Sequence, residues 1–323
     1  SKNLTLKYDD KMVGNIPIDA LASKAPIYER KWTTKKLSKE AIDLKKLNKI
    51  GVEDALVKIL SCPNHSNKSW VTNQYDQMVM CDTAQKSGSD AAIIRIHGRE
   101  KAIAVSVDSS ANYCKSHPLT GGKQIVCENW RNLISVGAKP LAITNCLNFG
   151  NPENNDVMGE FAECLEGIKD ACKYLNYPVV SGNVSFYNGT NNKNIYPTPV
   201  IGGVGLIDKL SQPINHNLKE DKNLLILIGK TFGHLEQSCF LKENFSMEDG
   251  KPPKINLINE KNNGEAVLEL IKEKYVLSCH DISNGGLLVA LSEMSIGSRL
   301  GVNINKPKKL VNLIEYFFGE DQG

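Results

Sequence analysis

The stretch VVSGNVSFYN, residues 179–188, carries residue types suited to holding a small ligand. An apolar pair runs directly into Gly182, Asn183 and Ser185. Glycine lets a ligand approach the main chain, asparagine offers an uncharged oxygen ligand, and serine offers a hydroxyl. Taken by itself, the stretch is explained at least as well by a tight turn as by a binding site.

Polar side chains also follow two other apolar runs. Asp108 ends the run KAIAVSVD, where a carboxylate can hold Mg2+ or can cap a turn through a backbone hydrogen bond. For Asp108, the residues alone favour the cap. Asn145, Asn148 and Asn151 occur in TNCLNFGNPE. Their amides suit hydrogen bonds to a base or ribose, and they equally suit an asparagine-rich turn.

Two glycine pairs stand before expected helices. Gly121 and Gly122 could let backbone amides approach a phosphate, but the spacing GxxxxGK[ST] is missing, so a plain helix entry is favoured. His280 and Asp281 end an expected strand, and the glycine pair 285–286 opens a helix. For this second segment, phosphate binding and a purely structural turn are equally good interpretations. No segment has the pattern of a nucleophile–base pair, a paired-carboxylate hydrolase or a zinc site.

The composition excludes several classes of protein. The chain has 323 residues and a net charge of +3, and it has no basic run interleaved with aromatic residues, so no nucleic-acid partner is expected. Apolar runs such as 224–228 fall far short of the roughly 20 residues of a membrane span, and no signal peptide is visible. Nine cysteines, an odd number, indicate reduced thiols and a cytoplasmic setting. Cys62 and His65 have a metal-like spacing, but no second pair completes it, so a loop is favoured.

Three parts follow one another along the chain. Residues 1–70 read as a tail and linker with a hairpin and helices, at 37–50 and 52–60. Residues 71–210 read as a compact α+β unit with two amphipathic helices. Its expected strands are 74–80, 91–97, 101–108, 140–149, 177–184 and 198–207. Residues 211–323 read as a layered α/β unit. Its expected strands are 223–229, 275–283 and 301–305, and its expected helices are 262–274, 284–297 and 308–319.

Together these segments resemble one family. SVDSSANYC, GGKQIVCENWRNLISVGAKPLAITNCLNFGNPE, GNVSFYN, HDISNGGL and FFGEDQG follow one another as in phosphoribosylformylglycinamidine synthase, also called formylglycinamide ribonucleotide amidotransferase. The resemblance covers about residues 1–323. LNFGNPE and GNVSFYN are specific to that family, whereas HDxSxGGL is shared with the wider aminoimidazole ribonucleotide synthetase-like superfamily.

The resemblance implies a fold. In this family the chain holds two copies of a two-domain unit, and this sequence is similar to the second copy. Residues 1–70 would then be the tail of the preceding domain and a linker. Residues 71–210 would be the second N-type domain, whose sheet joins its counterpart in a central barrel. Residues 211–323 would be a truncated C-type layered α/β domain.

The resemblance also implies an activity in purine biosynthesis. The family's ATP-dependent ligase phosphorylates the amide oxygen of formylglycinamide ribonucleotide, and ammonia displaces the phosphate from the iminophosphate to give the amidine. Ammonia comes from a glutaminase subunit, and a small bridging subunit completes the small form of the enzyme. The catalytic histidine lies in the first half of the subunit, so the present chain alone is expected to be inactive.

Four residues match binding positions of the family, and none matches a catalytic one. Asn145 and Gly182 correspond to contacts with ATP, Asn183 to a ligand of Mg2+, and Ser185 to a contact with the nucleotide substrate. Weaker candidates are Asp108, His280 and Asp281. The sequence departs from the family's pattern at three positions: Asn145 replaces an aspartate, Asn112 an arginine often found there, and Asn284 an acid.

Two alternatives remain open at this stage. The chain could be another ATP-dependent enzyme of the superfamily, against which LNFGNPE argues. It could also be a non-catalytic scaffold half with a structural nucleotide or none. Exposed barrel strands would allow the chain to pair with a second copy of itself.

Overall fold

The computed structural model describes all residues except 1, 35–49, 211–212, 306–311 and 322, so the helix expected at 37–50 lies outside the described residues. The chain divides into two compact units, Ser1–Lys31 and Trp32–Gly323. The division at residues 70 and 210 expected from the sequence stays a prediction. No helix in the described ranges is long and apolar enough to cross a membrane.

The first unit is the expected hairpin. Strands β1 (Asn3–Tyr8) and β2 (Lys11–Pro17) pair antiparallel, and the short helix α1 (Ile18–Leu21) follows them. Asp9 and Asp10 connect the strands with φ values of 45° and 59°. A two-residue turn in which both residues have positive φ matches the right-handed twist of the paired strands. Asparagine, aspartate and glycine are favoured at such positions.

The second unit is built on a six-stranded sheet with the order β3-β4-β5-β10-β6-β7. Neighbouring strands are antiparallel, except that β6 and β7 are parallel and are joined through helix α6. The strands are β3 (Thr83–Gln85), β4 (Ala92–Arg95), β5 (Ala102–Asp108), β6 (Lys139–Asn148), β7 (Val179–Ser185) and β10 (Thr198–Ile207). All but β3 confirm expected strands. A small hairpin, β8 (Gly189–Thr190) and β9 (Lys193–Asn194), follows β7.

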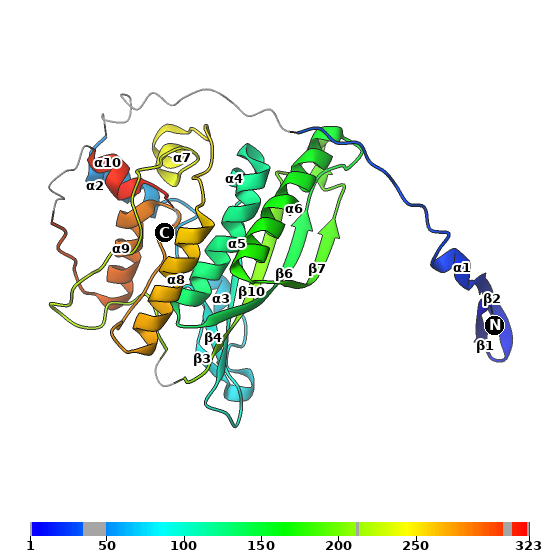
Figure 1. Ribbon diagram of the computed structural model, residues 1–323, viewed down its shortest axis with the longest axis horizontal. Helices are drawn as coiled ribbons and strands as arrows, with labels where there is room; N and C mark the ends of the chain where they lie inside the picture. The colour runs from blue at the N-terminus through cyan, green and yellow to red at the C-terminus, as the bar shows by residue number, and fades with distance from the viewer. Residues whose placement is uncertain (1, 35–49, 211–212, 306–311, 322) are drawn as a thin grey trace. The chain divides into compact units, whose positions relative to one another are not determined.

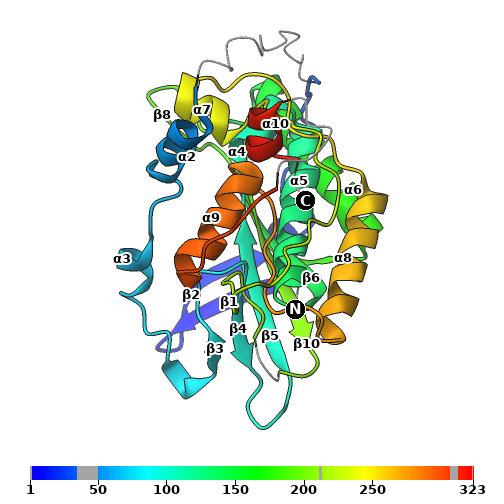
Figure 2. The same ribbon diagram turned by 90° about the vertical axis from the view of Figure 1, so that its left-hand side faces the viewer.

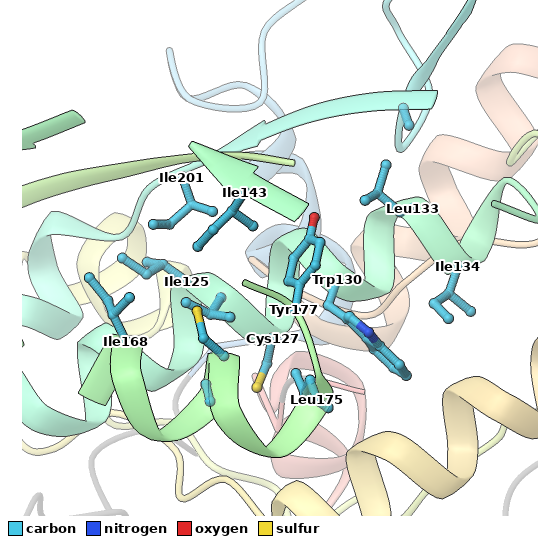
Figure 3. Close-up of a cluster of buried hydrophobic side chains, with 14 of the residues drawn as sticks. Ile125, Cys127, Trp130, Leu133, Ile134, Ile143, Ile168, Leu175, Tyr177 and Ile201 are labelled. Atoms are coloured by element: carbon cyan, nitrogen blue, oxygen red, sulfur yellow. The ribbon is translucent and has the colours of Figure 1, made fainter. Parts of the chain in front are cut away.

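Helices α5 (Pro118–Ser135) and α6 (Asn155–Leu175) cover one face of this sheet, as the sequence predicted from their apolar stripes. Trp130, Leu133 and Ile134 of α5 pack in the main core, which Figure 3 shows together with Ile143 and Ile201 of the sheet. Alternation of side chains along β5 and β10 sends every second residue into this core. The shorter α4 (Ala111–Ser116) precedes α5.

A second core joins helices from both ends of the larger unit. Helix α2 (Val52–Leu60) packs with α7 (Cys239–Phe245), α9 (Gly286–Ser298) and α10 (Leu313–Phe318). Helix α8 (Leu257–Lys272) packs against α5 instead, where Gly264 lies so close to the Trp130 ring that an added Cβ would stand 2.2 Å from it. The short helix α3 (Ser69–Thr72) and a 3-10 turn (Val79–Cys81) precede the sheet in the sequence.

Two acids near the end of the described chain hold this second core to the rest. Glu320 accepts hydrogen bonds from the backbone N–H groups of Gly285 and Cys239, both at 2.7 Å, and from the Tyr113 hydroxyl at 3.0 Å. Asp321 accepts three backbone N–H groups, from residues 232–234, at 2.7 to 3.1 Å. These carboxylates therefore satisfy donors from four separate segments.

Four expected strands are absent from the described structure. Residues 74–80 form turns, where the Asp76 carboxylate accepts the Met78 N–H at 2.8 Å and Met80 has a φ of 60°. The segments 223–229, 275–283 and 301–305 run without strand pairing, and Leu224 is 90% exposed. A strand needs a partner for its backbone groups, and a local apolar run does not record whether a partner exists. The layered α/β unit expected at 211–323 is therefore helical with irregular connections.

The sheet of this chain is open and does not close into a barrel by itself, so the barrel expected from its joining a counterpart stays a prediction. Strands β3 and β7 stand at its two edges. The face opposite α5 and α6 exposes apolar side chains, including Ile94, Val107 and Val204. An apolar face of this kind is typical of a surface that packs against another sheet.

Candidate functional site

The parallel pair β6 and β7 brings the four main candidates together. In the register of the two strands, Asn145 stands beside Gly182, and Cys146 beside Asn183. Two residues further along both strands, Asn148 stands beside Ser185. Helix α6 fixes this arrangement because it carries the chain from the end of β6 back to the start of β7, and its first turn is capped by the Asn154 side chain.

Gly182 makes room for the side chain of Asn145. A Cβ atom added at Gly182 would lie 2.1 Å from the Asn145 Oδ1 and 3.1 Å from the Asn145 carbonyl oxygen. Any larger residue would force the amide aside, so glycine at this position keeps the Asn145 side chain in its place. This contact is a structural reason for glycine in addition to the ligand approach expected from the sequence.

Asn183 and Ser185 lie on the other face of the same edge. Their neighbours there are Thr144 and Ser181, whose hydroxyl oxygens are 2.8 Å apart. The Asn183 Nδ2 lies 3.9 Å from the Cys146 Sγ, which leaves the amide oxygen of Asn183 for other contacts. The sequence reasoning missed Thr144 and Ser181, although their two-residue spacing from Cys146 and Asn183 places them on one face of the pleat.

The Ser185 hydroxyl receives a hydrogen bond from the Asn188 Nδ2 at 3.1 Å, and the Ser185 carbonyl accepts the same amide at 2.9 Å. This tie holds the turn after β7. The outer edge of β7 has no strand partner within the described ranges, and Val180 is 70% exposed. The strand therefore presents backbone groups together with amide and hydroxyl side chains, and a ligand can reach both faces around it.

Asp108 lies away from this edge and is used by the fold. It ends β5, and its carboxylate accepts hydrogen bonds from the Asn129 and Asn132 amides at 2.7 and 2.8 Å and from the Ser106 hydroxyl at 2.8 Å. Burial raises the pKa of Asp108 above its ordinary value. Strands β5 and β7 are three positions apart in the sheet, which is about 14 Å at the usual strand spacing.

His280 and Asp281 lie in the loop before α9, and the Asp281 Oδ2 is 3.9 Å from the Arg131 Nε of α5. The His280 Nδ1 is 2.7 Å from the Asp90 Oδ1, just before β4. Burial opposes a charge on His280, but Asp90 outweighs it and raises the pKa of His280 well above its ordinary value. Burial and the nearby Asp90 raise the pKa of Asp281 to about 7. The structure does not bring these two candidates to β7.

The remaining polar segments have structural partners. Helix α5 begins at Pro118 and not at the glycine pair, and the His117 Nδ1 accepts the Thr120 N–H as its cap. Added Cβ atoms at Gly121 and Gly122 would lie 2.5 Å from the Cys114 nitrogen and 2.3 Å from the Cys164 oxygen, so both glycines allow close helix packing. In TNCLNFGNPE, the Asn151 side chain accepts the N–H of Glu153 in an Asx turn.

The sequence matches two family models. "AIR synthase related protein, N-terminal domain" matches residues 88–207, and "AIR synthase related protein, C-terminal domain" matches residues 221–323. A "Phosphoribosylformylglycinamidine synthase subunit PurL" from Pelagibacter ubique is 54% identical over 324 residues, and one from Bradyrhizobium diazoefficiens is 42% identical over 323 residues. Each match covers 100% of this chain and 44% of the relative, so the chain spans less than half the length of these relatives.

Solved structures share the fold. "T. maritima PurL complexed with ATP" matches with a TM-score of 0.60 and 22% identity, over 100% of this chain and 45% of that one. "T. maritima PurL complexed with FGAR" matches with a TM-score of 0.60 and 23% identity, over 99% of this chain and 44% of that one. "Structure of PurLQS from Thermotoga maritima" also has a TM-score of 0.60, at 24% identity, over 90% of this chain and 42% of that one.

Proposed function

The chain belongs to the phosphoribosylformylglycinamidine synthase family of AIR synthase-related proteins, and from that membership we propose that it supplies the second half of a cytoplasmic synthetase subunit. The complete subunit would convert formylglycinamide ribonucleotide, glutamine-derived ammonia and ATP to the amidine through an iminophosphate. The observation that carries the proposal is the edge formed by β6 and β7. It groups Asn145, Gly182, Asn183 and Ser185 with the donors and acceptors such a ligand set needs.

Each of these residues would have a separate binding role. Asn145 would donate to the nucleotide from its place over Gly182, and Asn183 would offer its amide oxygen to Mg2+. Mg2+ prefers oxygen ligands and accepts a neutral one where phosphates bring the negative charge. When bound, Mg2+ neutralises charge on the phosphates of ATP. The Ser185 hydroxyl, held by Asn188, would contact formylglycinamide ribonucleotide.

The catalytic histidine would come from the first half of the subunit. The edge formed by β6 and β7 presents amides, hydroxyls and the Cys146 thiol, and its amides and hydroxyls bind and orient but do not act as acids or bases near neutral pH. The uncovered apolar face of the sheet, with Val107 and Val204, supports packing against that first half. A closed interface would also keep water from the iminophosphate. Glutaminase and small bridging subunits would deliver ammonia.

The experiment is a comparison of this chain with the complete subunit. With ATP, Mg2+, ammonia and formylglycinamide ribonucleotide, the complete subunit should form amidine and this chain alone should not. Asn183→Leu in the complete subunit should abolish most of the activity, whereas Val180→Ala on the same strand should retain it. Amidine formation by the chain alone would overturn the division of roles between the two halves.

A scaffold half remains the second candidate, because a purely structural half would use the same exposed apolar face. Calorimetric titration of the complete subunit with ATP and Mg2+ separates the two functions. An affinity that falls on Asn145→Ala supports the binding role of this half. An affinity unchanged by Asn145→Ala and by Asn183→Leu supports the scaffold.

A further inference from the structure

A second group of ligand-type side chains lies apart from β6 and β7, where three distant segments meet. Asp90 precedes β4, His216 lies in the connection after β10, and His280 lies in the loop before α9. One carboxylate oxygen and one ring nitrogen from each histidine all lie within 4.8 Å of one another. We propose that Asp90, His216 and His280 bind a single divalent transition-metal ion, for which Zn2+ is the best fit.

The donor set fits zinc in kind and in arrangement. Two imidazoles and one carboxylate are common zinc ligands, whereas Mg2+ prefers oxygen alone. Donors about 2.1 Å from a tetrahedral ion stand about 3.4 Å apart, so modest rotations of the rings bring this set onto one ion. The side chain of Asp90 is 0% exposed, and the rings of His216 and His280 are 5.2 Å apart between centroids.

An unsatisfied atom also points to a ligand. The Nδ1 of His216 is buried and has no hydrogen-bond partner within the described structure. Buried polar nitrogens normally have a partner, because an unpaired one lowers stability. An ion bound to the His216 ring would fix the orientation of the ring and stabilise the buried position of this residue.

Neighbouring groups already hold two of the three ligands, His280 and Asp90, in place. Glu293 of α9 lies 3.1 Å from the His280 Nε2, on the side of the ring away from Asp90. A carboxylate that accepts the second ring N–H of a ligating histidine orients that ring and makes it a better ligand. The ion would replace the hydrogen between the His280 Nδ1 and the Asp90 Oδ1, and that proton would pass to solvent. The backbone N–H of Asp281 donates to the same Asp90 oxygen at 3.3 Å.

The site would be separate from the nucleotide edge. Asp90 adjoins β4, which is four positions from β7 in the sheet, or about 19 Å at the usual strand spacing. With ligands from the segment before β4, from the connection after β10 and from the loop before α9, the ion would join the residues matched by the two family models. Three protein ligands leave one position of the tetrahedron for a water molecule, and the ion would remain in place during turnover.

The test uses the full chain after removal of metal with a chelator and dialysis against Zn2+. Elemental analysis should then find one Zn2+ per chain, and the midpoint of thermal unfolding should rise by several degrees. His216→Ala should lose both the ion and the rise. His97→Ala is the matched control, because His97 is 79% exposed and outside the cluster, and it should retain both. Bound Co2+ should give tetrahedral visible bands in the wild type and in His97→Ala only.

His216→Gln provides a second variant of similar size in case His216→Ala does not fold, which circular dichroism would show. Retention of a stoichiometric ion by either folded variant would overturn the proposal. Failure of the wild-type chain to take up Zn2+ would also overturn it, and would leave the three residues as an ion-paired cluster only.

Discussion

The contact between Gly182 and Asn145 predicts the effect of one added methyl group. In Gly182→Ala the new Cβ would stand 2.1 Å from the Asn145 Oδ1, so the Asn145 amide must rotate out of its place. The backbone oxygen of Asn145, at 3.1 Å, needs a shift of only a few tenths of an ångström. The substitution therefore moves a proposed nucleotide ligand without removing any side chain from the core.

The size of the effect follows from these contacts. Rotating the Asn145 side chain into a poorer conformation costs about 0.5–1.5 kcal/mol, so the free energy of unfolding should fall by about 1 kcal/mol. A displaced amide loses a hydrogen bond of about 1–1.5 kcal/mol to bound nucleotide. Since 1.4 kcal/mol corresponds to a factor of ten, the KM for ATP should rise about tenfold.

The assay is steady-state kinetics of the complete subunit with ATP varied, alongside thermal unfolding of each variant. Asn145→Ala should raise the KM for ATP by a similar factor, and the double variant should be no worse than either single one, because both remove one contact. Val180→Ala, on the same strand and exposed, serves as the control. A KM unchanged in Gly182→Ala, or raised equally in Val180→Ala, would refute the reasoning.

Three further predictions concern the site and the fold. Asn183→Leu in the complete subunit should lower the rate of amidine formation at least tenfold with no change in thermal unfolding, because the Asn183 side chain is exposed and supports no core contact. Full activity of this variant would mean that residues 179–188 form a turn without a binding role. Tyr177→Phe should lower the free energy of unfolding by about 1–3 kcal/mol, because it removes the hydroxyl that now donates to the buried Asn129 Oδ1 at 2.7 Å. Denaturant unfolding measures this change, and a decrease below about 0.5 kcal/mol would contradict the prediction. Burial raises the pKa of Glu320 to about 7. Between about pH 4.5 and 7 the folded chain therefore keeps a proton that the unfolded chain releases. The free energy of unfolding should fall as pH rises through that window, by up to about 3 kcal/mol. Glu320→Gln should flatten the pH profile of the unfolding free energy there, and parallel profiles for the two proteins would speak against it.

The elements that the sequence predicted correctly are those whose pattern of apolar residues is complete within the element itself. Helices α5 and α6 carry apolar residues at helical spacing, and β5 and β10 alternate or run apolar between clear breaks. Their burial against each other in the main core follows from those patterns. The unpaired segment 223–229 has an equally apolar pattern, but pairing depends on a partner elsewhere, which no local run encodes.

The candidate site was predictable in its residue types and not in its geometry. The sequence singles out Asn145 and Gly182, but only the parallel register shows that one stands over the other. The pleat then sends Asn183 to the opposite face, beside Cys146. The residues of the cluster at Asp90 are spread over 190 positions from Asp90 to His280, so no spacing rule connects them. The contact between Asn145 and Gly182 and the cluster at Asp90 both depend on contacts between residues far apart in the sequence.

The carboxylate of Glu320 also bears on how the chain is made. It closes contacts with Cys239 and Gly285, and with Tyr113, which lies 207 positions earlier. During synthesis the sheet and its two long helices can assemble first, because their contacts are nearer in sequence. The backbone N–H groups of Cys239 and Gly285, at the starts of α7 and α9, then stay hydrated until Glu320 has been synthesised. A nascent chain that ends before Glu320 lacks the carboxylate that joins these three segments, so the second core can be completed only late in synthesis.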